Sequence, residues 1–106
     1  MWMVDPRLMC RKHLLGEHVE LHMLVASMRN GISLQGFFEN KLIETHNVER
    51  RHQQLVQEMI RRGFNHASPL PKVPRRRAGR VDRSANLVEL ARRCAQCREL
   101  QEKMKR

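Results

Sequence analysis

The sequence predicts an all-α protein: a single compact domain of three main helices, a short connecting helix and an extended, basic, proline-rich strap. Two long segments carry apolar residues at helical spacing, no segment shows the alternation of a half-buried strand, and three prolines fall within residues 69–74. A chain of 106 residues has room for one modest core. Enzymes built from two domains are therefore excluded.

The first long helix is predicted from Cys10 to Asn30, with Gly31 at the position of a left-handed helix stop. Upstream, Asp5 is an N-cap followed by a proline, so residues 5–9 are expected to form one helical turn of their own or the start of the long helix. Apolar side chains occupy two flanks of the long helix and cover most of its circumference. We therefore expect this helix to be central and largely buried.

The next part of the chain combines a loop with the second long helix. Residues 31–44 contain two glycines and the pair Phe37 and Phe38, which predicts a loop and a short helix that plugs the core. The second long helix is expected to begin near Asn47 as its cap and to end in Arg-Arg-Gly-Phe at residues 61–64. Glycine followed by an apolar residue favours a Schellman stop there.

The last third of the chain separates a strap from a helix. Residues 68–83 hold three prolines and six basic residues, a composition that predicts an extended strap and excludes a helix. The last helix is expected to begin after Ser84, with apolar positions that run from Leu87 to Met104. We therefore divide the single domain, residues 1–106, into three parts: a core over residues 1–66, the strap over 67–83 and the C-terminal helix over 84–106.

The positive charge is concentrated in the second part of the chain. Lys and Arg number 21 against 11 Asp and Glu, a net of +10, and residues 67–106 alone carry 12 basic and 4 acidic side chains, a net of +8. This excess predicts a polyanion as partner, and because one Trp and three Phe are too few for a base-stacking platform, we expect duplex backbone. A solvated linker is the alternative for the strap. The arginines expected to contact DNA are Arg61, Arg62, Arg75, Arg76, Arg77 and Arg80.

The composition also bears on location. No apolar run is long enough to span a bilayer or to serve as the core of a secretory signal. Three cysteines, an odd number, favour reduced thiols over a disulfide framework. We expect a monomer without membrane contact that is cytoplasmic and joins the nucleoid while it is on DNA.

Histidines and carboxylates are concentrated in the first long helix. His13, Glu17 and Glu20 share one polar stripe, and because carboxylates on a mostly apolar helix are costly to desolvate without partners or water, the stripe indicates a cleft. His18 and His22 are expected to be core or interface histidines. Metal binding, by these two or by His13 with Glu17, is the weaker alternative because the spacing is not that of zinc hydrolases.

Two cysteines, Cys94 and Cys97, lie three residues apart in the predicted last helix. Zinc would need two further ligands of the right type, and a thioredoxin-like redox motif would need a preceding strand. Packing is therefore the favoured interpretation. Neither a metal ion nor a small-molecule cofactor is expected.

Two blocks within the first 65 residues carry a family resemblance. The first reads His-Leu-Leu-Gly-Glu-His-Val-Glu-Leu at residues 13–21. The second runs from Phe-Phe-Glu-Asn-Lys-Leu at residues 37–42, through Arg-Arg at 50–51, to Arg-Arg-Gly-Phe-Asn at 61–65. In this order they resemble the pyrimidine-dimer DNA glycosylases, the small helical enzymes typified by the phage endonuclease V, and the Arg-Gly-Phe-Asn ending is the most specific signal.

The resemblance implies a DNA repair enzyme with glycosylase and abasic-site lyase activity. Such enzymes flip a nucleotide out of the duplex, attack the sugar C1′ with the N-terminal α-amine and cleave the strand by β-elimination from the Schiff base. By position, the nucleophile falls on Met1, which the bulky Trp2 should protect from removal. The carboxylate that stabilises the cationic sugar and removes the 2′ proton falls on Glu20. His13 and Glu17 would be neighbours that tune this site.

The implied mechanism makes a geometric prediction. If the long helix begins near Cys10, Glu20 lies about 15 Å along its axis, and nine extended residues span up to roughly 30 Å. If the helix is continuous from Pro6, the distance is about 21 Å and five residues span only about 17 Å. Met1 reaches Glu20 only in the first case. The mechanism therefore predicts a break around Met9–Arg11.

The chain also departs from the family pattern. Two arginines that flank the family's glutamate are replaced by Val19 and Met23, so contacts with a lesion do not transfer. A compact branch that acts on abasic or differently damaged sites, or one that keeps only the fold, stays open. The competing functions are a non-enzymatic, basic nucleic-acid-binding protein and a metal-dependent hydrolase on the histidine-rich helix.

Overall fold

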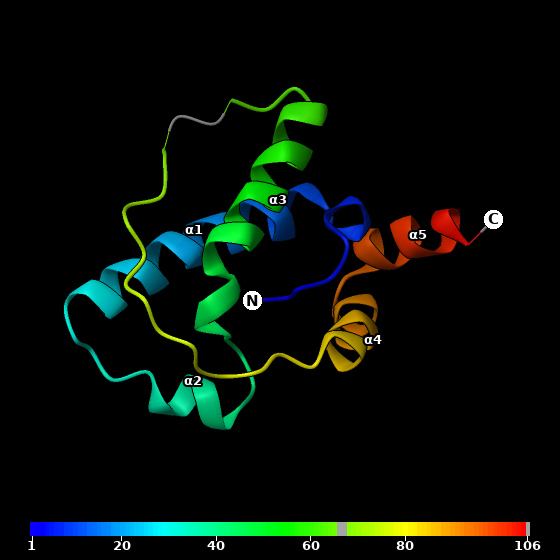
Figure 1. The fold of residues 1–106 in the computed structure, drawn as a ribbon. Coiled ribbons are helices and arrows are strands. Elements are labelled where there is room, and N and C mark those ends of the chain that lie inside the picture. The colour runs from blue at the N-terminus through cyan, green and yellow to red at the C-terminus, as the bar shows by residue number, and fades with distance from the viewer. Residues whose placement is uncertain (66–67, 106) are drawn as a thin grey trace.

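A computed structural model describes residues 1–65 and 68–105 of the chain, and Figure 1 shows its arrangement. The described residues form helices and no strand, which confirms the all-α prediction. The elements in chain order are η1 (Pro6–Leu8), α1 (Arg11–Arg29), α2 (Gln35–Glu39), η2 (Thr45–Asn47), α3 (Val48–Arg61), α4 (Arg83–Arg93) and α5 (Ala95–Met104). Among the described helices, none has the length and apolarity needed to cross a membrane.

The core forms where α1 and α3 cross, with the N-terminal segment and α4 closing its side (Figure 1). Leu14, Leu21 and Val25 of α1 are fully buried there. The opposite flank of α1 faces solvent, with Val19 56% and Met23 66% exposed. The prediction that apolar packing surrounds most of this helix is therefore wrong, because other elements cover only one side of it.

The chain breaks its helical course between η1 and α1. Asp5 caps η1 by accepting a hydrogen bond from the Arg7 N–H, and Met9 is extended, with φ −103° and ψ 134°. Cys10 is also extended and caps α1, so the break predicted around Met9–Arg11 is confirmed. Arg62 of α3 holds this corner by donating to the backbone carbonyl of Met9 at 2.7 Å.

The connection between the long helices differs in part from expectation. The second long helix ends as predicted: Gly63 adopts φ +81°, and the Phe64 N–H donates to the Met59 carbonyl at 2.8 Å, which closes a Schellman motif. In α2, Phe38 is half-buried against the core, whereas Phe37 is 51% exposed. Of the two phenylalanines, only Phe38 therefore packs against the core, because the two side chains point to different sides of one short helix.

The strap crosses the N-terminal end of α3 in an extended conformation, and residues 68–82 contain no helix. The boundary between core and strap, at residues 66 and 67, lies outside the described residues. Thr45 anchors the strap twice, because its N–H donates to the Ala78 carbonyl at 2.9 Å and its hydroxyl donates to the Arg76 carbonyl at 2.7 Å. The strap is therefore attached to the core through its backbone carbonyl groups.

The prediction of one C-terminal helix is wrong. Two helices, α4 and α5, meet at Cys94, which is extended, with φ −130° and ψ 112°. Asp82 caps α4 by accepting from the Ala85 N–H, so this helix begins at Arg83, two residues before the predicted start after Ser84. The break leaves α5 free to pack against η1, whereas a continuous helix would point away from it.

At Gly79 the backbone of the strap lies close against the core. Its φ is +84°, and a Cβ there would overlap the Ile43 carbonyl oxygen and lie 2.8 Å from Phe38 Cδ1. We expect Gly63→Ala, which has the same kind of φ and open space around it, to cost about 1–2 kcal/mol of unfolding free energy. Gly79→Ala should cost roughly 1–3 kcal/mol more, because overlap adds to strain. Urea denaturation of both variants measures the difference, and equal losses would contradict the close approach.

Candidate active site

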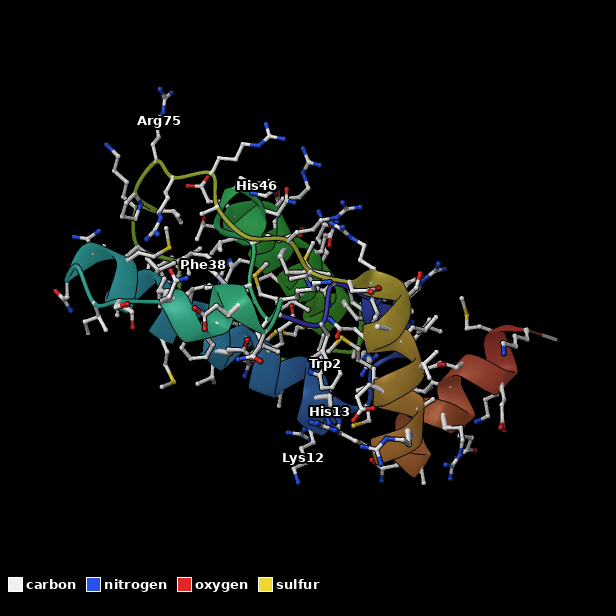
Figure 2. All side chains as sticks on the ribbon, turned by 90° about the horizontal axis from the view of Figure 1, so that it is seen from below. Trp2, Lys12, His13, Phe38, His46 and Arg75 are labelled. Atoms are coloured by element: carbon white, nitrogen blue, oxygen red, sulfur yellow. The ribbon has the colours of Figure 1, made fainter. Side chains whose placement is uncertain are left out.

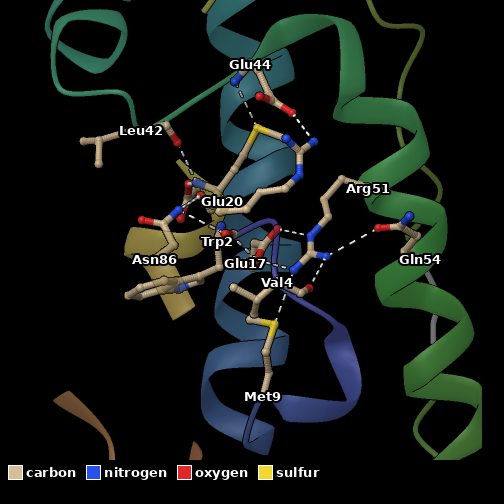
Figure 3. A network of polar contacts seen from close by, with 12 residues as sticks. Trp2, Val4, Met9, Glu17, Glu20, Leu42, Glu44, Arg51, Gln54 and Asn86 are labelled. Carbon is tan, nitrogen blue, oxygen red and sulfur yellow. Dashed lines mark hydrogen bonds and ion pairs between the residues drawn. The ribbon is translucent and has the colours of Figure 1, made fainter. Parts of the chain in front are cut away.

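The N-terminal amine lies at the side of α1 (Figure 3). The Met1 nitrogen donates to Glu20 Oε1 at 2.6 Å and to the backbone carbonyl of Leu42 at 2.8 Å. The Glu20 side chain is 48% exposed, so this ion pair sits at the surface although Met1 itself is buried. The structure therefore brings together the two residues to which the resemblance assigned catalysis.

The rest of residue 1 is fixed by packing and by hydrogen bonds. The Met1 side chain is buried in the core, where its sulfur accepts from the Glu44 N–H at 3.5 Å. On the other side, Asn86 of α4 donates to the carbonyls of Met1 at 3.2 Å and of Trp2 at 3.0 Å. The amine is thus held in one position by α1, the 40–44 loop and α4.

A buried ion pair supports the segment that follows the amine. Arg51 of α3 and Glu17 of α1 are both buried and form two hydrogen bonds, at 2.5 and 2.9 Å (Figure 3). Glu17 also accepts from the Trp2 N–H at 3.2 Å, and Arg51 also donates to the Val4 carbonyl at 2.6 Å. Residues 2–4 are therefore attached to both long helices through one pair of charges.

Glu44 connects the site to the strap. Its buried carboxylate accepts from the Val81 N–H at 2.8 Å and from Arg83 and Asn47, each also at 2.8 Å. Burial alone raises the pKa of a carboxyl, but the hydrogen bonds from Val81 and Asn47 and the charge of Arg83 outweigh it. The pKa of Glu44 consequently lies below its ordinary value.

A basic hollow of about 370 Å³ is lined by neighbours in sequence of the residues that hold the amine. It is lined by Lys41, Arg80 and Arg83 together with Val81, Asp82 and Ser84. Lys41 immediately precedes the residue whose carbonyl accepts from the amine, and Ser84 lies two residues before Asn86, which holds the Met1 carbonyl. Positive side chains are thus concentrated next in sequence to the residues that hold the candidate nucleophile.

The arginines expected on DNA are divided between two environments. Arg75, Arg76, Arg77 and Arg80 are exposed on the strap, and Figure 2 shows Arg75 pointing away from the body of the molecule. The Arg76 guanidinium stacks over the Phe38 ring at 4.9 Å.

The two arginines at the end of α3 lie at different depths. Arg61 is exposed and paired with Glu58. Arg62 is 17% exposed and donates to Glu58 and to the Pro6 and Met9 carbonyls. Through its Nε and Nη2 groups, Arg62 therefore supports the corner between η1 and α1.

The histidines of α1 lie away from the amine. His13 packs edge-on against the Trp2 ring, 5.8 Å between centroids, and its Nδ1 lies 3.1 Å from Cys10 Sγ (Figure 2). His18 and His22 meet each other and His52 of α3, with ring centroids 4.8–5.2 Å apart. Of the predicted polar stripe, only Glu20 contacts the amine directly.

Comparison with known proteins identifies the family. A family model described as pyrimidine dimer DNA glycosylase matches residues 1–72, more than half of the chain. The chain belongs to the pyrimidine dimer DNA glycosylase family. Neither the curated proteins nor the solved structures yield a match. The assignment makes damaged DNA the substrate of this glycosylase, and the match includes the amine, Glu20 and the Glu17–Arg51 pair.

Sequence reasoning missed three groups of this glycosylase site. Arg51 lies in one of the resembling blocks. A signal for it was available, because the Glu17 carboxylate on a mostly apolar helix needs a cationic partner. The Leu42 carbonyl carries no side-chain signal, since any residue offers one. Asn86 comes from α4, far along the chain, and its polar side chain is not distinguished by any pattern.

The buried pair predicts a large stability loss. Because Arg51→Met leaves the Glu17 carboxylate buried without its cation, it should lower the unfolding free energy by about 3–5 kcal/mol. Lys103→Met breaks the exposed pair with Glu99 and should cost less than about 1 kcal/mol. Urea denaturation compares the two variants. Similar losses would show that the Glu17–Arg51 pair does not hold the glycosylase fold.

Glu44 predicts a pH dependence of stability. Because its pKa is lowered from 4.5 in the folded state, its carboxylate stabilises the fold above that value, and this contribution is lost as the pH falls through the folded pKa. The stability difference between wild type and Glu44→Gln should therefore be largest near about pH 7 and shrink towards about pH 3. Glu49→Gln, an exposed change of equal charge, is the control. A difference that is constant with pH would contradict the prediction.

Proposed function

We propose that this glycosylase also has abasic-site lyase activity, with the Met1 α-amine as nucleophile and Glu20 as the catalytic carboxylate. The observation that supports it is the 2.6 Å contact between the amine and Glu20 Oε1. A nucleophile and a base within hydrogen-bond reach are the signature of nucleophilic catalysis. The amine is also pre-positioned, since the Leu42 carbonyl holds it from a second direction.

The first step requires a neutral amine. As an ammonium group it directs two of its hydrogens at Glu20 and Leu42. Loss of the third hydrogen gives a lone pair that points at neither acceptor. α-Amines are intrinsically less basic than lysine side chains, so this step needs no extreme environment. The two acceptors then fix the direction of attack.

The reaction proceeds through a covalent intermediate. The amine nitrogen bonds to C1′ of the flipped nucleotide, the bond from C1′ to the base breaks, and the base leaves with a proton. Opening of the sugar ring gives a protonated Schiff base between Met1 and C1′. Removal of a 2′ proton then breaks the bond between C3′ and the 3′ phosphate oxygen, and water releases the enzyme. On an abasic site the amine adds instead to the C1′ aldehyde, and uptake of a proton and loss of water give the same protonated Schiff base.

Glu20 serves this sequence in two ways. Its charge lies beside the nitrogen that becomes cationic, so it stabilises the developing positive charge. Once the amine has bonded to the sugar, the same carboxylate is placed to accept the 2′ proton. Half exposure lets Glu20 face a substrate and the amine together.

The basic hollow and the strap supply contacts for the DNA backbone. Lys41 and Arg80 lie in the hollow, where the phosphates that flank a flipped nucleotide would pass. Arg75 and Arg77 continue the positive surface along the strap. Val19 and Met23 are exposed on the face of α1 that carries Glu20 and make that face apolar. Apolar side chains suit insertion into the space that a flipped nucleotide leaves in the duplex better than they suit a charged contact with a lesion.

Borohydride trapping tests the proposal. Incubation of the chain with an abasic-site duplex and borohydride should leave a covalent adduct that maps to residue 1, in a preparation whose intact mass shows that Met1 is retained. Acetylation of the N-terminus should abolish the adduct. Glu20→Gln should slow its formation by at least about 100-fold, because it removes the base and the counter-charge. Absence of an adduct at high enzyme concentration would overturn the lyase proposal.

The matched control is Glu39→Gln, which removes an equal charge from an exposed position on α2. It should leave adduct formation unchanged. The competing function, non-enzymatic binding to nucleic acid, predicts equal affinity for intact and abasic duplexes, a steep fall of affinity with salt and no strand nicking. That set of results would replace the enzyme proposal by the binding one.

A further inference from the structure

Four potential metal ligands converge where the start of α1 meets the start of α5. Cys10 and His13 come from the start of α1, and Cys94 and Cys97 come from the start of α5. Their ligating atoms all lie within 4.8 Å of one another. Packing alone does not require three thiols and an imidazole ring nitrogen to point at one spot.

The two halves of the cluster have the same local geometry. Cys10 is the N-cap of α1, and His13 follows three residues later in its first turn. Cys94 is the N-cap of α5, and Cys97 follows three residues later. In each half, two residues separate the ligands, which is a spacing that structural zinc sites use. Zinc was disfavoured at Cys94 and Cys97 because two further ligands were needed. The fold supplies them as Cys10 and His13.

The distances suit a tetrahedral metal. Zn–S bonds of about 2.3 Å and Zn–N bonds of about 2.0–2.1 Å place two sulfurs about 3.8 Å apart, and a sulfur and a nitrogen about 3.6 Å apart. Here Cys94 Sγ and Cys10 Sγ are 3.8 Å apart, and Cys97 Sγ and His13 Nδ1 are 3.6 Å apart. Cys10 Sγ and His13 Nδ1 are closer, at 3.1 Å, so a small rotation of one side chain completes the geometry.

Backbone N–H groups and two helix N-termini are directed at the cluster. The Cys10 N–H donates to Cys97 Sγ at 3.2 Å, and the Cys97 N–H donates to Cys94 Sγ at 3.4 Å. The N-termini of α1 and α5 both face the cluster, which stabilises negative charge. Three thiolates, one neutral imidazole and Zn²⁺ carry a net charge of −1, and the positive charges of Lys12 and Arg93 act on this corner.

We propose that Cys10, His13, Cys94 and Cys97 form a structural Zn²⁺ site. Four protein ligands leave no open position, so the ion joins elements and does not activate water. It would tie the break before α1 to the break before α5, and with them the corner from which residues 1–9 fold back. Metal binding releases the three thiol protons to solvent. The proposal does not depend on the lyase mechanism.

The site also lies close to the N-terminal segment. The ring of His13 packs edge-on against Trp2, the residue that follows the candidate nucleophile, as Figure 2 shows. Since Trp2 is the one tryptophan of the sequence, its fluorescence reports on this corner of the protein. Removal of the metal should therefore change the tryptophan emission.

Metal analysis of the full chain tests the proposal. After expression with zinc and gel filtration under reducing conditions, the wild type should contain about one zinc ion per chain. Cys94→Ser and Cys97→Ser should each lower this to below about 0.2. His22→Gln and His52→Gln, in the separate histidine cluster, should leave it at about one. Zinc that follows the histidine variants and not the cysteine variants would overturn the assignment.

Cobalt gives a second test that does not depend on the folding of a variant. Wild-type chain stripped with a chelator and titrated with Co²⁺ should develop the thiolate-to-cobalt charge-transfer bands and saturate at about one equivalent. Stripping should also lower Tm by at least about 5 °C and shift the Trp2 emission, and Zn²⁺ should reverse both. Absence of these bands, or a metal-free wild type with a disulfide between Cys10 and Cys94, would overturn the proposal.

Discussion

The buried contact between Glu17 and Arg51 is the interaction on which the N-terminal segment depends. Neither charge could stay in the core alone, so α1 and α3 must cross where the carboxylate and the guanidinium meet. The same pair also binds the N-terminal segment: Glu17 accepts from the Trp2 N–H, and Arg51 donates to the Val4 carbonyl. These contacts fix the position of residues 2–4 along α1, and this places the Met1 amine beside Glu20.

In the strap, backbone groups make the contacts with the core, and most arginine side chains are exposed. Its attachment to the core uses the carbonyls of Arg76 and Ala78 and the N–H groups of Ala78 and Val81. Glycine at position 79 allows the approach. Because main-chain groups do the anchoring, most of the guanidinium groups in this segment stay at the surface, where a polyanion can reach them.

What the sequence could predict followed local chemistry. The Schellman end of α3 and the break before α1 depend on a glycine, a cap and the reach of nine residues, all of which are visible in one segment. The split at Cys94 and the exposure of Phe37 depend on neighbours far along the chain. The same holds for the site: Glu20 could be proposed from a block of residues, whereas the support of Met1 by Asn86 arises only when α4 packs against the N-terminus.

Glu17 and Glu20 lie within one turn of the same helix, yet the structure gives them different chemistry. Glu17 is 1% exposed and pairs with the buried guanidinium of Arg51, so loss of either charge would cost several kcal/mol of unfolding free energy. Glu20 is half exposed and holds only the amine. An ion pair of this kind is weak, so Glu20 can exchange the amine for a proton or a cationic sugar at little cost. In the proposed reaction, the carboxylate must return to its starting state after each turnover, and the weak pairing of Glu20 suits it to that role better than the buried pairing of Glu17 does.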